Sequence, residues 1–250
     1  MHHMLFPITT PSICRGILAG ALLAFATVSH AATVTWGAAT NITGDSDVST
    51  TGTLVGAVHL GDASVTATTV NGVTFVGATA TGGPVTSGNF ALSTVTAIVV
   101  PTAAAPFSSL SAPYQALLGL GAGDFGTPVT LTMSALVTGQ TYQFQWWSNV
   151  SGNATNFVTT ATAGGAVSLS SNTGGATGGL GQYAIGTFVA DATTQVITFS
   201  RTTVAEDIAG FQLRQIASAS AVPEPGSALV GMMTLGVCFS GLVKRSRQAK

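Results

Sequence analysis

The sequence predicts an all-β protein, an antiparallel β-sandwich that lies between two apolar terminal segments. Thr, Val, Ala, Ser and Gly dominate the region between the two ends, and apolar and polar residues alternate along several short stretches of it. Clusters of Gly, Pro, Asn and Asp separate these stretches, as they separate the strands of antiparallel sheets. At about 190 residues, the region is long enough for one domain with a sizeable core.

The N-terminal segment predicts a signal peptide over residues 1–31. Arg15 precedes the apolar run 16–28, which is followed by Ser29 and Ala31. These two small residues occupy the −3 and −1 positions of a cleavage site after Ala31. We therefore expect signal peptidase to cut there, so that the exported chain begins at residue 32.

The C-terminal segment predicts a single transmembrane helix over residues 227–243. The stretch carries no charged side chain, and as a helix it would reach about 26 Å, slightly less than the ~30 Å hydrocarbon layer. A buried core helix is the alternative, but such a helix would have no face for water. The basic tail 244–250 should stay in the cytoplasm under the positive-inside rule. Its topology-setting residues are Lys244, Arg245, Arg247 and Lys250.

Residues 222–250 resemble a PEP-CTERM sorting signal, the tail of exported proteins in bacteria that make extracellular polysaccharide. Three parts occur in the family's order: the motif Val222-Pro223-Glu224-Pro225, the apolar segment and the basic tail. The resemblance implies that an exosortase cuts near the motif and removes the membrane span. The protein would then reach the cell surface or extracellular matrix from a single-pass precursor with a cytoplasmic C-terminus. Residues 217–221, "ASASA", predict a linker before this signal.

The ectodomain is predicted to cover residues 32–216 and to contain eight to ten strands. One short helix is expected over 111–121, with Gly121 as its end, and the glycine-rich stretch 163–181 is expected to be a loop that flanks a short strand. The segments with the clearest strand pattern are 64–70, 72–79, 93–100, 128–136, 141–148, 183–190, 194–200 and 208–216.

A second resemblance refines this fold. The stretches "LTMSALVTGQTYQFQWW", "GQYAIGTFVADATTQVITFS" and "IAGFQLR" are similar, in their order, to jelly-roll domains of the galactose-binding type. The resemblance covers roughly 90 residues and implies a jelly-roll-like sandwich. Many members of that group are associated with carbohydrate.

Charge and residue types exclude several classes of function. Between residues 32 and 221 the chain has no cysteine and one histidine, His59, so it offers neither a disulfide nor a zinc ligand set. Two arginines stand against seven acidic residues, which gives 2 − 7 = −5 and no basic patch for nucleic acid. No cofactor is expected, and the one alternative left open is a structural Ca²⁺. Its candidate ligands are Asp45 and Asp47 in "DSDVST", although the stretch is no EF-hand because Thr50 stands at the required glycine.

The stretch "TYQFQWWSN" (141–149) suggests a glycan-binding face. In a strand, Gln143, Gln145 and Trp147 share one face, and an indole ring with neighbouring amides is suited to gripping a sugar. The alternative is that Trp147 packs beneath a loop while the glutamines line an ordinary solvated sheet. The opposite face, with its three other aromatic residues, is expected to be core.

We expect a non-enzymatic surface or extracellular-matrix protein that an exosortase sorts and that is associated with extracellular polysaccharide. One alternative is a carbohydrate-binding module that recognises a specific glycan. A second alternative is a cryptic glycoside hydrolase, which would need two of the seven acids in one cleft. Nothing in the sequence selects such a pair.

Overall fold

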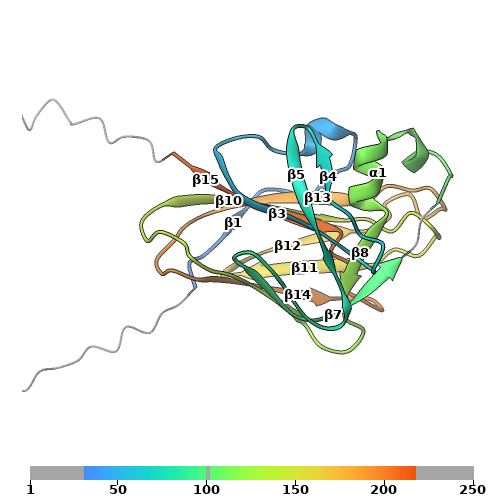
Figure 1. Cartoon of the computed structure of the whole chain (residues 1–250). Coiled ribbons are helices and arrows are strands. Elements are labelled where there is room, and N and C mark those ends of the chain that lie inside the picture. The colour runs from blue at the N-terminus through green and yellow to red at the C-terminus, as the bar shows by residue number, and fades with distance from the viewer. Residues whose placement is uncertain (1–30, 100–101, 218–250) are drawn as a thin grey trace, which may run out of the picture.

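The strands of this chain pair into two β-sheets that pack face to face. The computed structural model describes residues 31–99 and 102–217, and the predicted all-β sandwich is confirmed for this part of the chain (Figure 1). In order, the larger sheet contains β1 (Thr35–Trp36), β13 (Gln182–Val189), β10 (Thr141–Ser148), β15 (Gly210–Ile216), β3 (Thr53–Gly61), β5 (Val73–Thr79) and β4 (Thr68–Val70), and β2 (Thr40–Asn41) also pairs with β13. The smaller sheet contains β12 (Gly165–Ser170), β11 (Val158–Ala163), β14 (Gln195–Arg201), β9 (Val129–Met133), β7 (Phe90–Val99) and β6 (Thr81–Ser87), and β8 (Leu120–Gly123) pairs with β7.

The sequence predicted antiparallel sheets throughout. The larger sheet departs from this prediction because β3 and β5 run parallel. Between them in the chain lies β4, which pairs with the far side of β5. The turn Asn71-Gly72, in which both residues have positive φ, joins β4 to β5 as a two-residue hairpin. This hairpin brings β5 back alongside β3 in the same direction.

The described residues form fifteen strands, more than the eight to ten expected. The sequence pattern predicts no strand at β1, β2, β3, β6, β8 or β11, and β12 lies within the stretch 163–181, which the sequence predicts to be a loop flanking a short strand. Gly82, Gly83 and Pro84 make β6 look like a separator, but β6 lies at the edge of its sheet, where proline is tolerated. In β11, "VTTATA", the inward-facing residues are small, so the alternation is weak.

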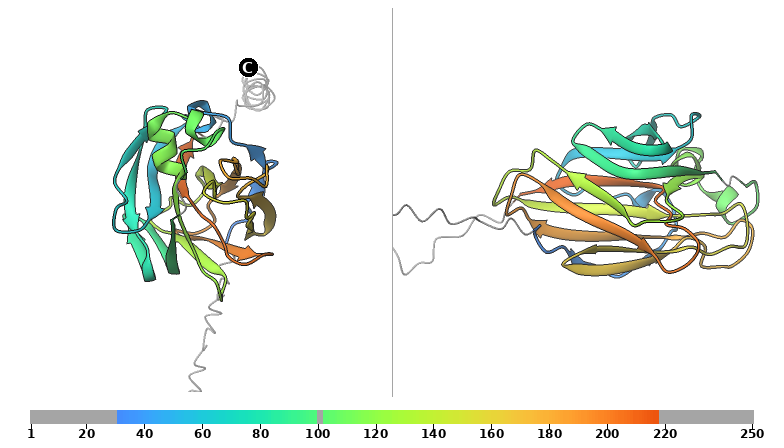
Figure 2. Two further views of the ribbon diagram at one scale, coloured as in Figure 1. Left: turned by 90° about the vertical axis from the view of Figure 1, so that its right-hand side faces the viewer. Right: turned by 90° about the horizontal axis from the view of Figure 1, so that it is seen from below.

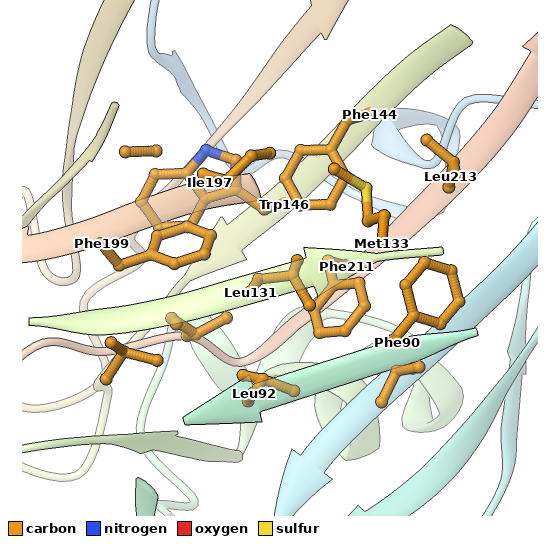
Figure 3. Packing of buried hydrophobic residues seen from close by; sticks show 14 of the residues in the cluster. Phe90, Leu92, Leu131, Met133, Phe144, Trp146, Ile197, Phe199, Phe211 and Leu213 are labelled. Carbon is orange, nitrogen blue, oxygen red and sulfur yellow. The ribbon is translucent and has the colours of Figure 1, made fainter. Parts of the chain in front are cut away.

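The main core fills the space between the two sheets. From the larger sheet, Phe144, Trp146 and Phe211 point inward, and they meet side chains of β7, β9 and β14 (Figure 3). The Trp146 and Phe199 rings contact edge to face, with centroids 5.0 Å apart. The predicted core face of β10 is thus confirmed, because Tyr142, Phe144 and Trp146 are all buried.

A second, smaller core covers the outer face of the larger sheet. The helix α1 (Ala112–Leu118) and the 3-10 helices η1 (Asp45–Asp47) and η2 (Phe107–Ser109) belong to the segments that lie over this face, where α1 is visible above the sheet in Figure 1. Beneath them, Tyr114, Leu117, Phe75 and Trp147 pack together. Strand β10 is therefore buried on both faces.

The helix α1 begins one residue later than the sequence predicted and ends three residues earlier. The Ser111 hydroxyl caps it by accepting a hydrogen bond from the Tyr114 N–H at 3.2 Å. The Gly119 N–H donates to the Gln115 carbonyl and closes the last turn. Gly121, the predicted end, instead lies in β8, where a Cβ atom would come within 2.6 Å of the Asp207 carboxylate.

Both described ends of the chain lie at the same end of the sandwich. Because β1, β13, β10 and β15 pair antiparallel in this order, β1 begins where β15 ends (Figures 1 and 2). The connections 149–157, 171–181 and 202–209 lie at the opposite end. Within the residues that the structure describes, no helix has the length and apolar character needed to cross a membrane, and the predicted span 227–243 lies outside them.

Removal of either indole from β10 should destabilise the fold to a similar degree. We expect Trp147→Ala and Trp146→Ala each to lower the free energy of unfolding by about 3–5 kcal/mol in urea denaturation, because each leaves a large cavity in a buried cluster. Val196→Ala on the exposed face of β14 is the control and should change it by less than about 0.5 kcal/mol. Wild-type stability in Trp147→Ala would contradict burial of the outer face of β10.

Candidate functional site

Trp147, the aromatic residue of the predicted glycan-binding face, is buried and cannot stack on a sugar at the surface. Its ring meets Phe75 edge to face, with centroids 5.6 Å apart, and its exposed fraction is 0%. The indole Nε1–H donates to the Tyr114 hydroxyl at 3.1 Å. Burial raises the pKa of that hydroxyl far above its ordinary value, so Tyr114 stays protonated. The indole is thus part of the second core.

The two glutamines of the predicted face bind the chain itself. The Gln145 side chain donates to the Asp47 carbonyl at 2.6 Å and accepts from the Ser49 N–H at 2.9 Å, and the Gln143 side chain accepts from the Ser49 hydroxyl at 2.6 Å. On the adjacent strand, the Arg214 guanidinium donates to the carbonyls of residues 50–52. These polar groups fasten segment 47–52 over the sheet. The predicted glycan face is therefore wrong for Gln145 and Trp147, since both are fully covered.

Asp45 and Asp47 also serve the segment that covers the sheet. The Asp47 carboxylate accepts from the N–H groups of Thr43 and Gly44 at 2.7 and 3.0 Å, and from the Tyr114 hydroxyl at 3.2 Å. Asp45 accepts from the Ser111 hydroxyl at 2.6 Å. A carboxylate surrounded by hydrogen-bond donors does not fit a calcium site, which needs oxygen ligands converging on one point. In the described part of the chain, no group of three or more His, Cys, Asp or Glu side chains could hold a metal ion.

His59 lies inside the larger sheet and is almost fully buried. Its Nδ1 lies 3.4 Å from the Thr66 carbonyl oxygen. Burial lowers the pKa of the imidazole, which therefore remains neutral near pH 7. These contacts suit a structural residue.

Two buried acids occupy the segment between β14 and β15. Asp207 is wholly buried, and its Oδ2 accepts from the Ser148 hydroxyl at 2.9 Å and from the Asn149 N–H at 2.7 Å. Its Oδ1 has no hydrogen-bond partner within the described chain. Burial raises the pKa of Asp207 to about 7, against the two hydrogen bonds that favour the charged form. The neighbouring Glu206 is 1% exposed, and burial raises its pKa as well.

Glu206 forms a partly buried ion pair with Arg201, the last residue of β14. The closest approach joins Arg201 Nη1 to Glu206 Oε2 at 3.8 Å, and the Arg201 N–H donates to Glu206 Oε1 at 3.1 Å. The guanidinium also donates to two carbonyls of the turn after β8, those of Asp124 at 3.3 Å and Gly126 at 3.2 Å. Arg201 thus braces this turn against the end of β14.

The braced turn, residues 124–127, presents the most exposed aromatic side chain of the described residues. The Asp124 carboxylate accepts from the N–H groups of Gly126 and Thr127, and these bonds lower its pKa. Phe125 projects from the turn with 56% of its surface exposed, while every other aromatic side chain in the described part of the chain is buried or half-buried. No sequence pattern pointed to Phe125 as a site residue. The Asp-x-Gly-Thr order could have indicated a turn, but not the exposure of the ring.

Two of the shallow grooves in the described structure have no acid among their lining residues. One, of about 350 Å³, lies between β1, β13 and the start of β10, and is lined largely by Thr33, Thr35, Thr141 and Thr187. The other, of about 270 Å³, lies between β3, β5 and the β6–β7 turn and is mostly apolar. The buried pair Glu206 and Asp207 faces neither groove.

The remaining predicted site residues concern processing. Ala31 is exposed at the start of the described chain. Ser29, the motif 222–225 and the basic residues of 244–250 lie outside the described residues.

The buried carboxyl of Asp207 should make stability depend on pH. Because its pKa in the folded protein, about 7, exceeds the ordinary value of 3.8, the free energy of unfolding should rise as pH falls from about 7 to 4, by roughly 4 kcal/mol in total. Asp207→Asn removes this term, so the variant should be more stable than wild type at pH 8 and equal to it near pH 4.

Urea denaturation of both proteins at several pH values measures the difference, which also cancels the opposing contribution of His59. Exposed Asp191→Asn is the matched control and should follow wild type at every pH. A constant offset between Asp207→Asn and wild type across this range would contradict a raised pKa.

No protein-family model matches this chain, and no curated protein or solved structure matches it at a significant level.

Proposed function

We propose that this chain is an exported, non-enzymatic surface or extracellular-matrix protein that an exosortase sorts and that is associated with extracellular polysaccharide. One observation carries the proposal: β1 begins and β15 ends at the same end of the sandwich (Figure 2). The predicted signal peptide and sorting signal would therefore join the domain at one end. The loops at the opposite end would point away from the membrane during sorting.

The placement of the reactive side chains supports a non-enzymatic role. Glu206 and Asp207 are both almost fully covered, and their closest partners are side chains and N–H groups of the fold itself. His59 is buried in the larger sheet. A glycoside hydrolase needs two carboxyl groups that face a substrate in a cleft, and this pair does not.

The outer face of the smaller sheet supports association with polysaccharide. In register across β12, β11 and β14, hydroxyl groups stand side by side: Thr160 pairs with Ser168 and Ser200, and Thr162 pairs with Thr198. The Thr160 and Ser168 hydroxyls lie 2.8 Å apart. Such a surface offers donors and acceptors without charge, which suits the hydroxyl groups of a polysaccharide.

The charge of the domain favours a neutral polysaccharide over an acidic one. Residues 32–217 contain two arginines, no lysine and seven acids, a formal charge of 2 − 7 = −5. Like charges repel an acidic chain at moderate salt. We also propose that the domain is a jelly roll of the galactose-binding type, and the two-sheet architecture supports this assignment.

The mass of the mature protein tests the sorting route. We expect intact mass spectrometry of the protein from the envelope and medium of its own cells to show loss of both ends, near Ala31 and near Pro223-Glu224-Pro225. Replacement of Pro223, Glu224 and Pro225 by alanine should leave an uncut chain in the membrane. The linker variant Ser218→Ala/Ser220→Ala is the control and should be processed normally. A wild-type chain that still ends at Lys250 in membranes would show a permanent anchor and overturn the proposal.

A further inference from the structure

We propose that the braced turn 124–127, together with the adjoining loop 202–204, is the surface through which the domain contacts a neutral polysaccharide, with Phe125 as the stacking residue. This inference rests on the proposed association with polysaccharide and assigns it a site. The sequence had suggested the outer face of β10 as the glycan-binding surface, but the indole of Trp147 on that face is buried.

The turn 124–127 is held by hydrogen bonds within itself and by hydrogen bonds to Arg201 and Glu206. The Asp124 carboxylate binds two N–H groups within the turn, and its carbonyl accepts both from Arg201 and from the Glu206 N–H at 3.3 Å. Arg201 also holds the Gly126 carbonyl, while Glu206 balances its charge. A turn whose backbone is already held in this way loses little conformational freedom when a ligand binds, which favours affinity.

The exposure of Phe125 has no explanation in the packing of the domain. Its 56% exposed fraction contrasts with the complete burial of Phe75, Phe144 and Phe199. Val204, in the loop that follows Arg201, is 65% exposed. Two large apolar side chains thus stand in the solvent on two loops that Arg201 and Glu206 hold together. Exposed apolar side chains on adjoining loops are typical of interaction sites.

The groups around the ring fit a neutral sugar. Thr127 is exposed in the same turn and offers a hydroxyl, while the ring of Phe125 can cover the apolar side of a pyranose. The Thr202 and Thr203 hydroxyls are instead bonded to the backbone of Val158. The Arg201 guanidinium donates to backbone carbonyls and faces Glu206, so the turn provides no cation dedicated to an anionic sugar. With the net charge of −5, these features select an uncharged polysaccharide.

The site is tested by measuring how the processed protein, purified from its own cells, binds to insoluble neutral glucans, galactans and mannans. We expect wild type to bind at least one of them and Phe125→Ala to bind it at least tenfold more weakly, the loss typical of a central aromatic contact. Phe125→Trp should restore binding. Val137→Ala is the matched control, because Val137 has the same exposed fraction, 56%, on a different loop, and it should bind as wild type does.

Other outcomes separate the two proposals. Equal binding by wild type and Phe125→Ala would overturn this site and leave the association with polysaccharide intact. Binding by wild type to acidic polysaccharides alone would overturn this site and the preference for a neutral polysaccharide. Binding to no polysaccharide would overturn both this site and the association, while the sorting route would still be judged by the mature mass. Loss of a dimer in Phe125→Ala, seen by light scattering, with unchanged glycan binding would assign the ring to contact with a second copy instead. The urea midpoint of Phe125→Ala should equal that of wild type, since the ring is exposed.

Discussion

The fold depends on the burial of β10 on both faces. One face carries Trp146 into the core between the sheets, and the other carries Trp147 into the second core beneath α1. A sheet of a simple two-layer sandwich would expose that second face. Here segments 42–52 and 102–119 cover that face. The result is a three-layer arrangement over part of the larger sheet.

The covering layer is held by polar contacts in addition to its buried apolar side chains, among them Ile42, Phe107 and Leu117. Gln145, Gln212 and Arg214 project from the larger sheet and satisfy the backbone of residues 47–52. Asp47 connects the same segment to Tyr114 of α1, whose hydroxyl in turn accepts from the Trp147 indole. The buried polar groups of Asp47, Gln145 and Trp147 thus find partners, as a buried network must to be stable.

At the opposite end of the sandwich from the two described chain ends, buried charged residues hold neighbouring loops together. Asp207 locks the end of β10 to the β14–β15 connection, while Glu206 and Arg201 lock that connection to the turn after β8. The polar groups that close the core therefore also fix the turn that carries Phe125.

The sequence by itself determined the β-rich class, most strand positions and the core face of β10, because alternation with period two records which residues face a core. Residues 141–148 show this most clearly, since the predicted and observed strand coincide. The sequence also predicts the processing segments through local composition, and these lie outside the described residues. Only the tertiary structure decided that the outer face of β10 is covered, that Asp45 and Asp47 hold a loop, and that Phe125 is exposed. Burial of a given side chain depends on which distant segments lie over it, and Ser49, Tyr114 and Arg201 act on residues far away along the chain.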